Sequence, residues 1–152
     1  MAINVDTTYR INRNQDHEEQ MRYLVRDLRI FNGYPQILTI SALIGYANQA
    51  YVPFTNRAEP VQTTFFEERE KDIMNFLAYM KEGNQSVLQE KSKDDPDRNK
   101  MFQAFECYAN GGFPILCKKL NVDFVEKDNN DRYTILLNYY KMLLSNDLMD
   151  ID

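Results

Sequence analysis

The sequence has few of the side chains that most enzyme active sites require. It contains one histidine, His17, two cysteines, Cys107 and Cys117, and no tryptophan among 152 residues. A structural zinc site usually needs four Cys or His ligands, and this chain has three residues of these types in total. A catalytic thiol needs a neighbour such as histidine to lower its pKa, and His17 is predicted to lie in water at a helix start. We therefore expect no metal ion, no cofactor and no enzymatic activity, with both thiols reduced.

Other classes of site are also missing. No lysine has an acidic residue two positions before it, the spacing used by metal-dependent nucleases of the restriction type. The Gly111-Gly112 pair lacks the Gly-Lys-Ser/Thr ending of a phosphate-binding loop, so we interpret it as a helix breaker. There is no run of about 18 apolar residues, and no basic segment precedes an apolar one near Met1. These absences predict a cytoplasmic protein without a membrane span.

What the sequence does contain is a repeated helical pattern of apolar residues. The composition, with 43% hydrophobic and 27% charged residues, is that of an ordinary globular domain. The spacing predicts helices at residues 16–31, 36–50, 64–82, 85–91, 96–109, 114–119 and 131–145. We therefore expect a mainly α fold, a compact single-domain bundle of six to seven helices over residues 1–152. An extended arm at residues 1–14, room for one short strand pair and a frayed acidic tail at residues 146–152 complete this prediction.

Several helix ends carry local signals. Gly33, followed by Pro35, is predicted to end the first helix in a left-handed conformation. Thr64 and Glu67 have the spacing of a capping box, and Gly83 is predicted to end the helix that begins there. The helix at residues 36–50 is nearly uncharged, so we expect it to be the most buried one.

Charge is distributed unevenly along the chain. Residues 1–60 hold six basic and six acidic side chains, so residues 61–152 carry the whole net charge of −5. A strongly basic face typical of nucleic-acid-binding proteins is therefore absent. Arginine nevertheless predominates near the N-terminus, and its guanidinium group binds phosphate well. The predicted DNA-contacting residues are Arg10, Arg13, Arg22, Arg26, Arg29 and Arg57. The alternative is a solvated helix face that pairs with Glu18, Glu19 and Asp27.

Aromatic side chains are abundant, with ten Tyr and nine Phe. We expect most of them in the core, while those near loops and helix ends are candidates for partner binding, because interfaces favour Tyr. These candidates are Tyr46, Tyr51, Phe54, Tyr108 and Phe113. Stacking on bases is a further option that needs an adjacent basic groove.

Three segments carry a resemblance to a known family. They are Phe31-Asn32-Gly33-Tyr34-Pro35 with the helix ending Leu43-Ile44-Gly45-Tyr46-Ala47-Asn48; Phe65-Phe66 with Ile73-Met74-Asn75-Phe76-Leu77-Ala78 and Glu82-Gly83-Asn84-Gln85-Ser86-Val87-Leu88; and Phe105-Glu106-Cys107-Tyr108-Ala109-Asn110-Gly111-Gly112-Phe113-Pro114-Ile115-Leu116. In this order and spacing they resemble the small accessory proteins encoded beside bacterial DNA phosphorothioation (Dnd) gene clusters, called Dnd system-associated protein 4. The likeness covers roughly residues 20–120.

The resemblance implies a non-catalytic accessory subunit of a DNA-modification and antiphage defence system. Its implied partners are a larger defence-system protein and the DNA backbone, and a homo-oligomer remains open. Members usually carry a run of basic residues after the helix end, where this chain has residues 48–51 without charge. That departure favours docking onto a partner protein. Two alternatives stay open: an adaptor or assembly factor without DNA affinity, and a phage-encoded acidic inhibitor acting through Glu67, Glu68 and Glu70.

Overall fold

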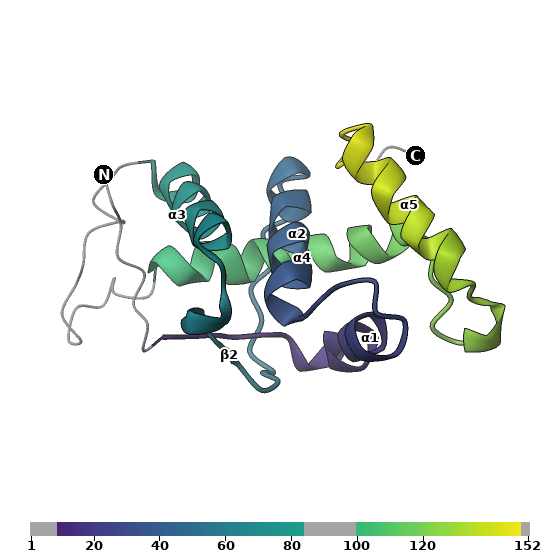
Figure 1. The fold of residues 1–152 in the computed structure, drawn as a ribbon. Coiled ribbons are helices and arrows are strands. Elements are labelled where there is room, and N and C mark those ends of the chain that lie inside the picture. The colour runs from purple at the N-terminus through teal and green to yellow at the C-terminus, as the bar shows by residue number, and fades with distance from the viewer. Residues whose placement is uncertain (1–8, 84–99, 150–152) are drawn as a thin grey trace.

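The computed structural model describes residues 9–83 and 100–149 (Figure 1). Over these residues the helices are α1 (Glu18–Arg22), α2 (Tyr34–Ala47), α3 (Glu68–Glu82), α4 (Lys100–Leu120) and α5 (Arg132–Leu144), and the strands are β1 (Arg10–Ile11) and β2 (Val61–Gln62). The mainly helical class is confirmed, with fewer helices than the six to seven expected. The helix expected at residues 85–91 and the helix start expected at residue 96 lie outside the described residues.

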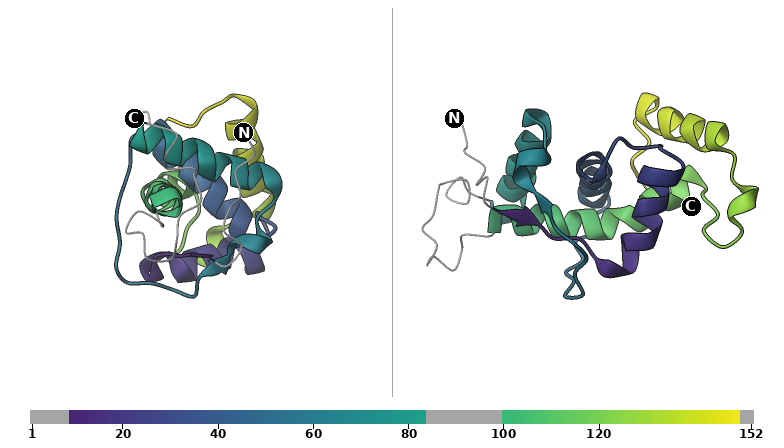
Figure 2. Two further views of the ribbon diagram at one scale, coloured as in Figure 1. Left: turned by 90° about the vertical axis from the view of Figure 1, so that its left-hand side faces the viewer. Right: turned by 60° about the horizontal axis from the view of Figure 1, so that its bottom comes forward.

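Helix α4 runs through the middle of the fold, and α2 and α3 pack across it (Figures 1 and 2). The C-terminal end of α4 leads into a loop, and α5 follows this loop. Helix α5 lies beside the C-terminal end of α4. Thirteen of the 21 residues of α4 are buried, compared with seven of fourteen in α2. The prediction that residues 36–50 form the most buried helix is therefore wrong, because α4 and not α2 occupies the centre.

Gly111, Gly112 and Pro114 do not break α4, contrary to the sequence prediction. The two glycines instead allow α2 and α4 to touch backbone to backbone. A Cβ atom built on Gly112 would lie 1.8 Å from the Ser41 carbonyl oxygen, and one on Gly111 would lie 1.9 Å from the Ala50 carbonyl oxygen. The helix predicted separately at residues 114–119 is thus the second half of α4.

The N-terminal segment forms the short strand pair for which the sequence left room. β1 pairs antiparallel with β2, with Arg10 opposite Gln62 and Ile11 opposite Val61. An isolated bridge between Asn14 and Arg57 extends this pairing. The connector after α2 therefore returns along the N-terminal arm, as far as that arm is described.

The helix predicted at residues 16–31 is not one regular α-helix but three short helical segments of different type. A 3-10 turn (Gln15–His17) precedes α1, and a π-helical turn (Tyr23–Asp27) follows it. The left-handed residue after this segment is Arg29, with φ 52°, and not Gly33. Gly33 has an extended φ of −179° and begins α2, with Pro35 in the first turn, where its missing N–H costs nothing.

Helix α3 begins four residues later than predicted. Residues Thr63–Phe65 form a 3-10 turn, and the capping box uses Glu67 and Glu70 in place of Thr64 and Glu67. Each of these two glutamate side chains accepts a hydrogen bond from the other residue's backbone N–H. The predicted end at Gly83 is confirmed, with φ 77°.

Helix α5 begins after Asp131, as predicted, and buries a narrow stripe. Ile135, Tyr139 and Met142 are buried, whereas Tyr140, Leu143 and Leu144 are exposed. The ring of Tyr139 packs edge-on against Phe31, with 4.9 Å between ring centroids.

The chain after α5 is held against the fold as far as it is described. Asn48 Nδ2 donates to the Leu148 carbonyl at 2.9 Å, and Lys119 Nζ pairs with Asp147 at 3.2 Å. Residues 146–149 are therefore in contact with the fold, and the frayed tail stays a prediction. Residues 150–152 lie outside the described part of the chain.

Candidate functional site

Arg13 is buried, unlike the other five predicted DNA-contacting arginines, which are exposed. Its Nη2 pairs with Glu18 Oε2 at 2.6 Å, and its Nε donates to the Glu59 carbonyl at 3.0 Å. Its guanidinium carbon lies 4.1 Å from the centre of the Tyr34 ring. Arg13 therefore joins three chain segments, and only 4% of it is exposed.

Glu18 is the second centre of this network. The Tyr34 hydroxyl donates to Glu18 Oε1 at 3.1 Å, while Arg13 pairs with the other oxygen. Burial alone raises the pKa of the Glu18 carboxyl, but the hydrogen bonds from Arg13 and Tyr34 hold it below its ordinary value. The carboxylate thus stays ionised and is occupied within the fold.

Arg22, Arg26 and Arg29 form what we call the arginine face: Arg22 ends α1, Arg26 lies in the π-helical turn, and Arg29 follows that turn in the left-handed conformation. All three are exposed. The alternative of pairing with Glu18, Glu19 and Asp27 is seen for Arg13, which pairs with Glu18. No carboxylate of the described residues lies within 4.0 Å of Arg22, Arg26 or Arg29. The positive charge of this face is therefore available to an external anion.

Arg132 of α5 adds to the same region. It donates from Nε to the Leu28 carbonyl at 2.6 Å and from Nη2 to the Arg29 carbonyl at 3.1 Å. These bonds satisfy carbonyls at the end of the π-helical turn and fasten the arginine face to α5.

Arg10 and Arg57 lie on a different surface, around a pocket of about 480 Å³ that Tyr51 and Phe54 also line. Glu106 reaches this pocket from α4 and is 6% exposed. Its Oε2 accepts from the Asn12 backbone N–H at 2.6 Å and from the Tyr9 hydroxyl at 3.3 Å. Burial raises the pKa of the Glu106 carboxyl to about 7, although these two donors and Arg57 oppose the shift.

Glu106 should make stability depend on pH. The unfolded chain loses this proton near pH 4.5 and the folded chain near pH 7, so the free energy of unfolding should fall as pH rises through that window. A shift from 4.5 to about 7 corresponds to about 3 kcal/mol. We expect Glu106→Gln to remove this fall in urea unfolding between pH 5 and 8. An equally steep pH dependence in the variant would contradict the assignment.

His17 is a second titrating group in part of this pH range. Burial lowers the pKa of its imidazole, and the neighbouring Asp16 only partly offsets that effect. Its contribution therefore has the opposite sign below pH 6.5, because the unfolded chain binds the proton more readily. The contribution of Glu106 is therefore obtained by subtracting the free energy of unfolding of Glu106→Gln from that of the wild type at each pH.

The aromatic candidates for partner binding are less exposed than expected. Phe113 is 0% exposed and Tyr108 8%, so both are core residues in this structure and not surface anchors. Tyr46 and Tyr51 are half-buried and pack against the core. Phe54 is half-buried beside the Glu106 pocket.

An exposed apolar stripe on α5 was missed in the sequence analysis. It consists of Tyr133, Leu137, Tyr140 and Leu144, with exposed fractions of 71%, 52%, 48% and 86%. At 3.6 residues per turn this α5 stripe lies opposite the buried side of the helix. The sequence carries this signal as a 4-3-4 spacing, but it does not show which side of the helix is covered.

Potential metal ligands and thiols are dispersed over the described residues. Residues 9–83 and 100–149 contain no group of three or more His, Cys, Asp or Glu side chains arranged to hold a metal ion. Both cysteines are free thiols, and burial raises the pKa of Cys107 and brings that of Cys117 to about 12. Within the same ranges, no helix is both long and apolar enough to span a bilayer.

Comparison with known protein families shows to which family the chain belongs. The family described as DNA sulphur modification system-associated protein 4 matches residues 10–147. The chain belongs to this family. No curated protein and no solved structure matches it.

The match to the DNA sulphur modification system-associated protein 4 family extends beyond the resemblance at roughly residues 20–120. It begins at β1 and includes all of α5. The arginine face, the Glu106 pocket and the α5 stripe therefore all lie within the matched range. The description of the family associates its members with DNA sulphur modification systems.

Proposed function

We propose that the protein is a non-catalytic accessory subunit of a DNA sulphur modification system that docks onto a larger protein of that system through the α5 stripe. The observation that carries this proposal is that α5 is apolar on two opposite sides, one buried against the fold and one in water. Contiguous exposed apolar residues mark interaction sites in soluble proteins. The family's association with DNA sulphur modification systems supports a partner from such a system.

The dimensions of α5 favour a larger partner over a second copy of this chain. A helix of 13 residues is about 20 Å long. Stable interfaces bury about 800 Å² on each partner, more than one side of such a helix offers to an identical helix. A groove that surrounds the exposed half of α5 covers more of it, as in helix-in-groove recognition.

The arginine face supports a second function, contact with the DNA backbone. Three exposed guanidinium groups that have no carboxylate of residues 9–83 or 100–149 within 4.0 Å can pair with phosphates. Such contacts position a protein on DNA without reading its sequence. Docking and backbone contact together describe a subunit that places its partner on DNA.

The arginine face gives a direct prediction for DNA binding. Replacing Arg22, Arg26 and Arg29 with Ala should weaken duplex binding at least about tenfold at low salt and reduce the slope of log K against log salt by up to about three. A gel shift titrated with salt measures both. Replacing Arg69, Lys118 and Lys141, which are exposed on α3, α4 and α5, removes the same charge and should leave the slope nearly unchanged. Equal effects of the two triple variants would remove the proposal of a specific backbone contact.

Two alternative functions predicted from the sequence, a pure adaptor and an acidic inhibitor, would give different results in binding experiments. A pure adaptor co-purifies with its partner from the native host after nuclease treatment and has no DNA affinity of its own. An acidic inhibitor loses its partner when Glu67, Glu68 and Glu70 are neutralised. Glu67 and Glu70 cap α3, which gives them a role within the fold and weakens the support for the inhibitor.

A further inference from the structure

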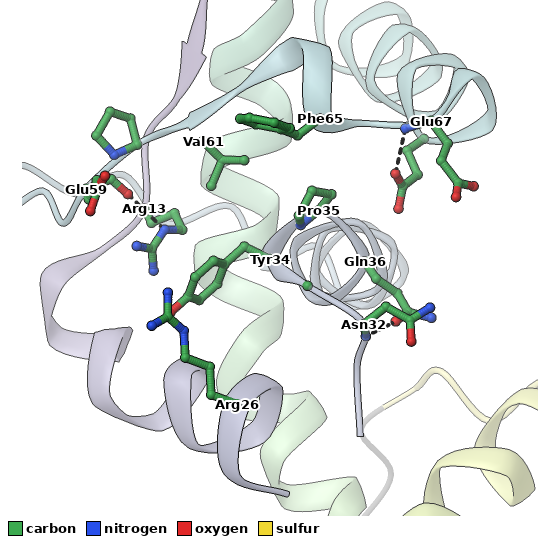
Figure 3. Close-up of a pocket in the computed structure, with 13 residues that line it drawn as sticks. Arg13, Arg26, Asn32, Tyr34, Pro35, Gln36, Glu59, Val61, Phe65 and Glu67 are labelled. Atoms are coloured by element: carbon green, nitrogen blue, oxygen red, sulfur yellow. Dashed lines mark hydrogen bonds between the residues drawn. The ribbon is translucent and has the colours of Figure 1, made fainter. Parts of the chain in front are cut away.

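A pocket of about 620 Å³ opens beside the arginine face, between the start of α2 and the segment around β2 (Figure 3). Arg26 belongs both to the lining of this pocket and to the arginine face. A DNA strand held by the arginine face would therefore pass the mouth of the pocket. We call it the α2 pocket.

One side of the α2 pocket is suited to an anion. Arg13 and Arg26 lie on this side, next to Tyr34 (Figure 3). Arg13 is 4% exposed, and its Nη1 has no hydrogen-bond partner. The N-terminus of the 14-residue helix α2 also faces the pocket, and no side chain caps it at Gly33. Uncapped backbone N–H groups and the helix dipole favour an anion at such a position.

The acidic residues of the pocket limit the charge of that anion. Glu67 lies by the start of α3, away from the two arginines (Figure 3), and is bonded with Glu70 in the capping box. Glu59 uses its backbone carbonyl to bind Arg13. Three carboxylates near the pocket disfavour a doubly charged phosphate monoester by like-charge repulsion. A singly charged diester is the better match.

The remaining wall of the α2 pocket is apolar. Pro35, Val61 and Phe65 line it, and Phe65 is 68% exposed (Figure 3). An ordinary phosphodiester, whose non-bridging atoms are both oxygen, gains little from such a wall. Sulphur is larger, softer and a weaker hydrogen-bond acceptor than oxygen, and it makes favourable contacts with aromatic rings.

We propose that the α2 pocket recognises a phosphorothioate diester in DNA. The non-bridging oxygen of the group lies toward Arg26, Arg13 Nη1 and the N-terminus of α2, while its sulphur atom contacts Phe65 and Val61. This inference rests on the DNA contact proposed above, and it adds that the protein distinguishes sulphur-modified DNA from unmodified DNA.

The test measures the affinity of the whole protein for three duplexes of one sequence by fluorescence anisotropy. Two duplexes carry a single phosphorothioate, one for each configuration at phosphorus, and the third is unmodified. Because the charged and apolar walls are fixed relative to each other, only one configuration should bind more tightly, by about three- to tenfold. Phe65→Ala should abolish this difference, so that all three duplexes bind this variant with the same affinity. Tyr133→Ala, an equally exposed aromatic on α5, should preserve it.

The outcomes separate this inference from the proposed DNA contact. Salt-dependent binding with equal affinity for all three duplexes overturns sulphur recognition and leaves the DNA contact standing. No binding to any duplex overturns both. An equal gain for both configurations that persists in Phe65→Ala also overturns the inference, because the sulphur then adheres outside the α2 pocket. Val61→Thr, which keeps the size of the side chain and adds a hydroxyl, should reduce the preference by a smaller factor than Phe65→Ala.

Discussion

Replacing Gly112 with alanine is expected to lower the free energy of unfolding by more than about 3 kcal/mol, beyond the usual cost of overpacking. The new Cβ atom would lie 1.8 Å from the Ser41 carbonyl oxygen and 2.5 Å from the Gly45 backbone nitrogen. Both atoms belong to the backbone of α2, so no side-chain rotation relieves the clash and the two helices must separate. The better helix propensity of alanine returns only about 1 kcal/mol. Urea unfolding followed by circular dichroism measures the loss.

Gly33 provides the matched control for this substitution. It has an extended φ of −179°, and a Cβ atom there would have its nearest neighbour at 3.6 Å, on Pro35. Gly33→Ala should therefore change stability by no more than about 0.5 kcal/mol. If Gly112→Ala were as stable as this control, the close contact between α2 and α4 would not exist in solution.

Replacing Leu137 and Leu144 with aspartate is expected to reduce the affinity for the partner protein at least about 100-fold, while the fold stays intact. Central interface residues commonly contribute 2 kcal/mol or more, and a buried unpaired carboxylate adds a further cost. Both side chains are exposed in the free protein, at 52% and 86%, so the substitutions disturb no core contact. Co-purification from the native host after nuclease treatment measures the loss, and thermal unfolding verifies the fold.

Val125→Asp is the control for the α5 variant, since Val125 is 88% exposed and lies away from α5, in the loop that precedes it. It should leave co-purification unchanged. Retention of the partner by the α5 double variant would contradict the proposed docking surface. Sedimentation of the purified protein adds a further outcome: self-association that the double variant loses would identify a second copy of the chain as the occupant of the α5 stripe.

Local signals predicted several elements correctly. The helix after Asp131, the end of α3 at Gly83 and the strand pair of the N-terminal segment all follow from neighbouring residues. The capping box shows the limit of this approach, because Thr64 and Glu67 satisfy the same pattern as Glu67 and Glu70. Packing of the Thr63–Phe65 turn selects the later start of α3.

Long-range contacts explain the main errors. Gly111 and Gly112 resemble a helix breaker locally, and only the approach of α2 shows why a continuous helix needs them there. Arg13 is buried because Glu18, Tyr34 and the Glu59 carbonyl converge on it from separate segments. No pattern among neighbouring residues distinguishes Arg13 from the exposed Arg10.

The candidate surfaces were predictable to different degrees. Exposure of Arg22 and Arg26 follows from helical spacing against the buried Met21 and Leu24, whereas Arg29 lies beyond the helical turns. The α2 pocket does not follow from spacing, because its walls come from α2, the β2 segment and the turn after α1. The α5 stripe required a choice between two sides of one helix, and only packing shows which side is covered.

The crossing of α2 and α4 gives the protein the properties of a rigid spacer. Backbone contact at Gly45, Gly111 and Gly112 leaves no side-chain layer that could slide or rotate between the two helices. The α2 pocket opens at the start of α2, and α5 is fastened beside the arginine face by the bonds of Arg132 to the Leu28 and Arg29 carbonyls. A macromolecule gripped at the arginine face and another seated on α5 would be kept at a constant separation and angle, so that the chain sets the geometry of an assembly by its stiffness alone.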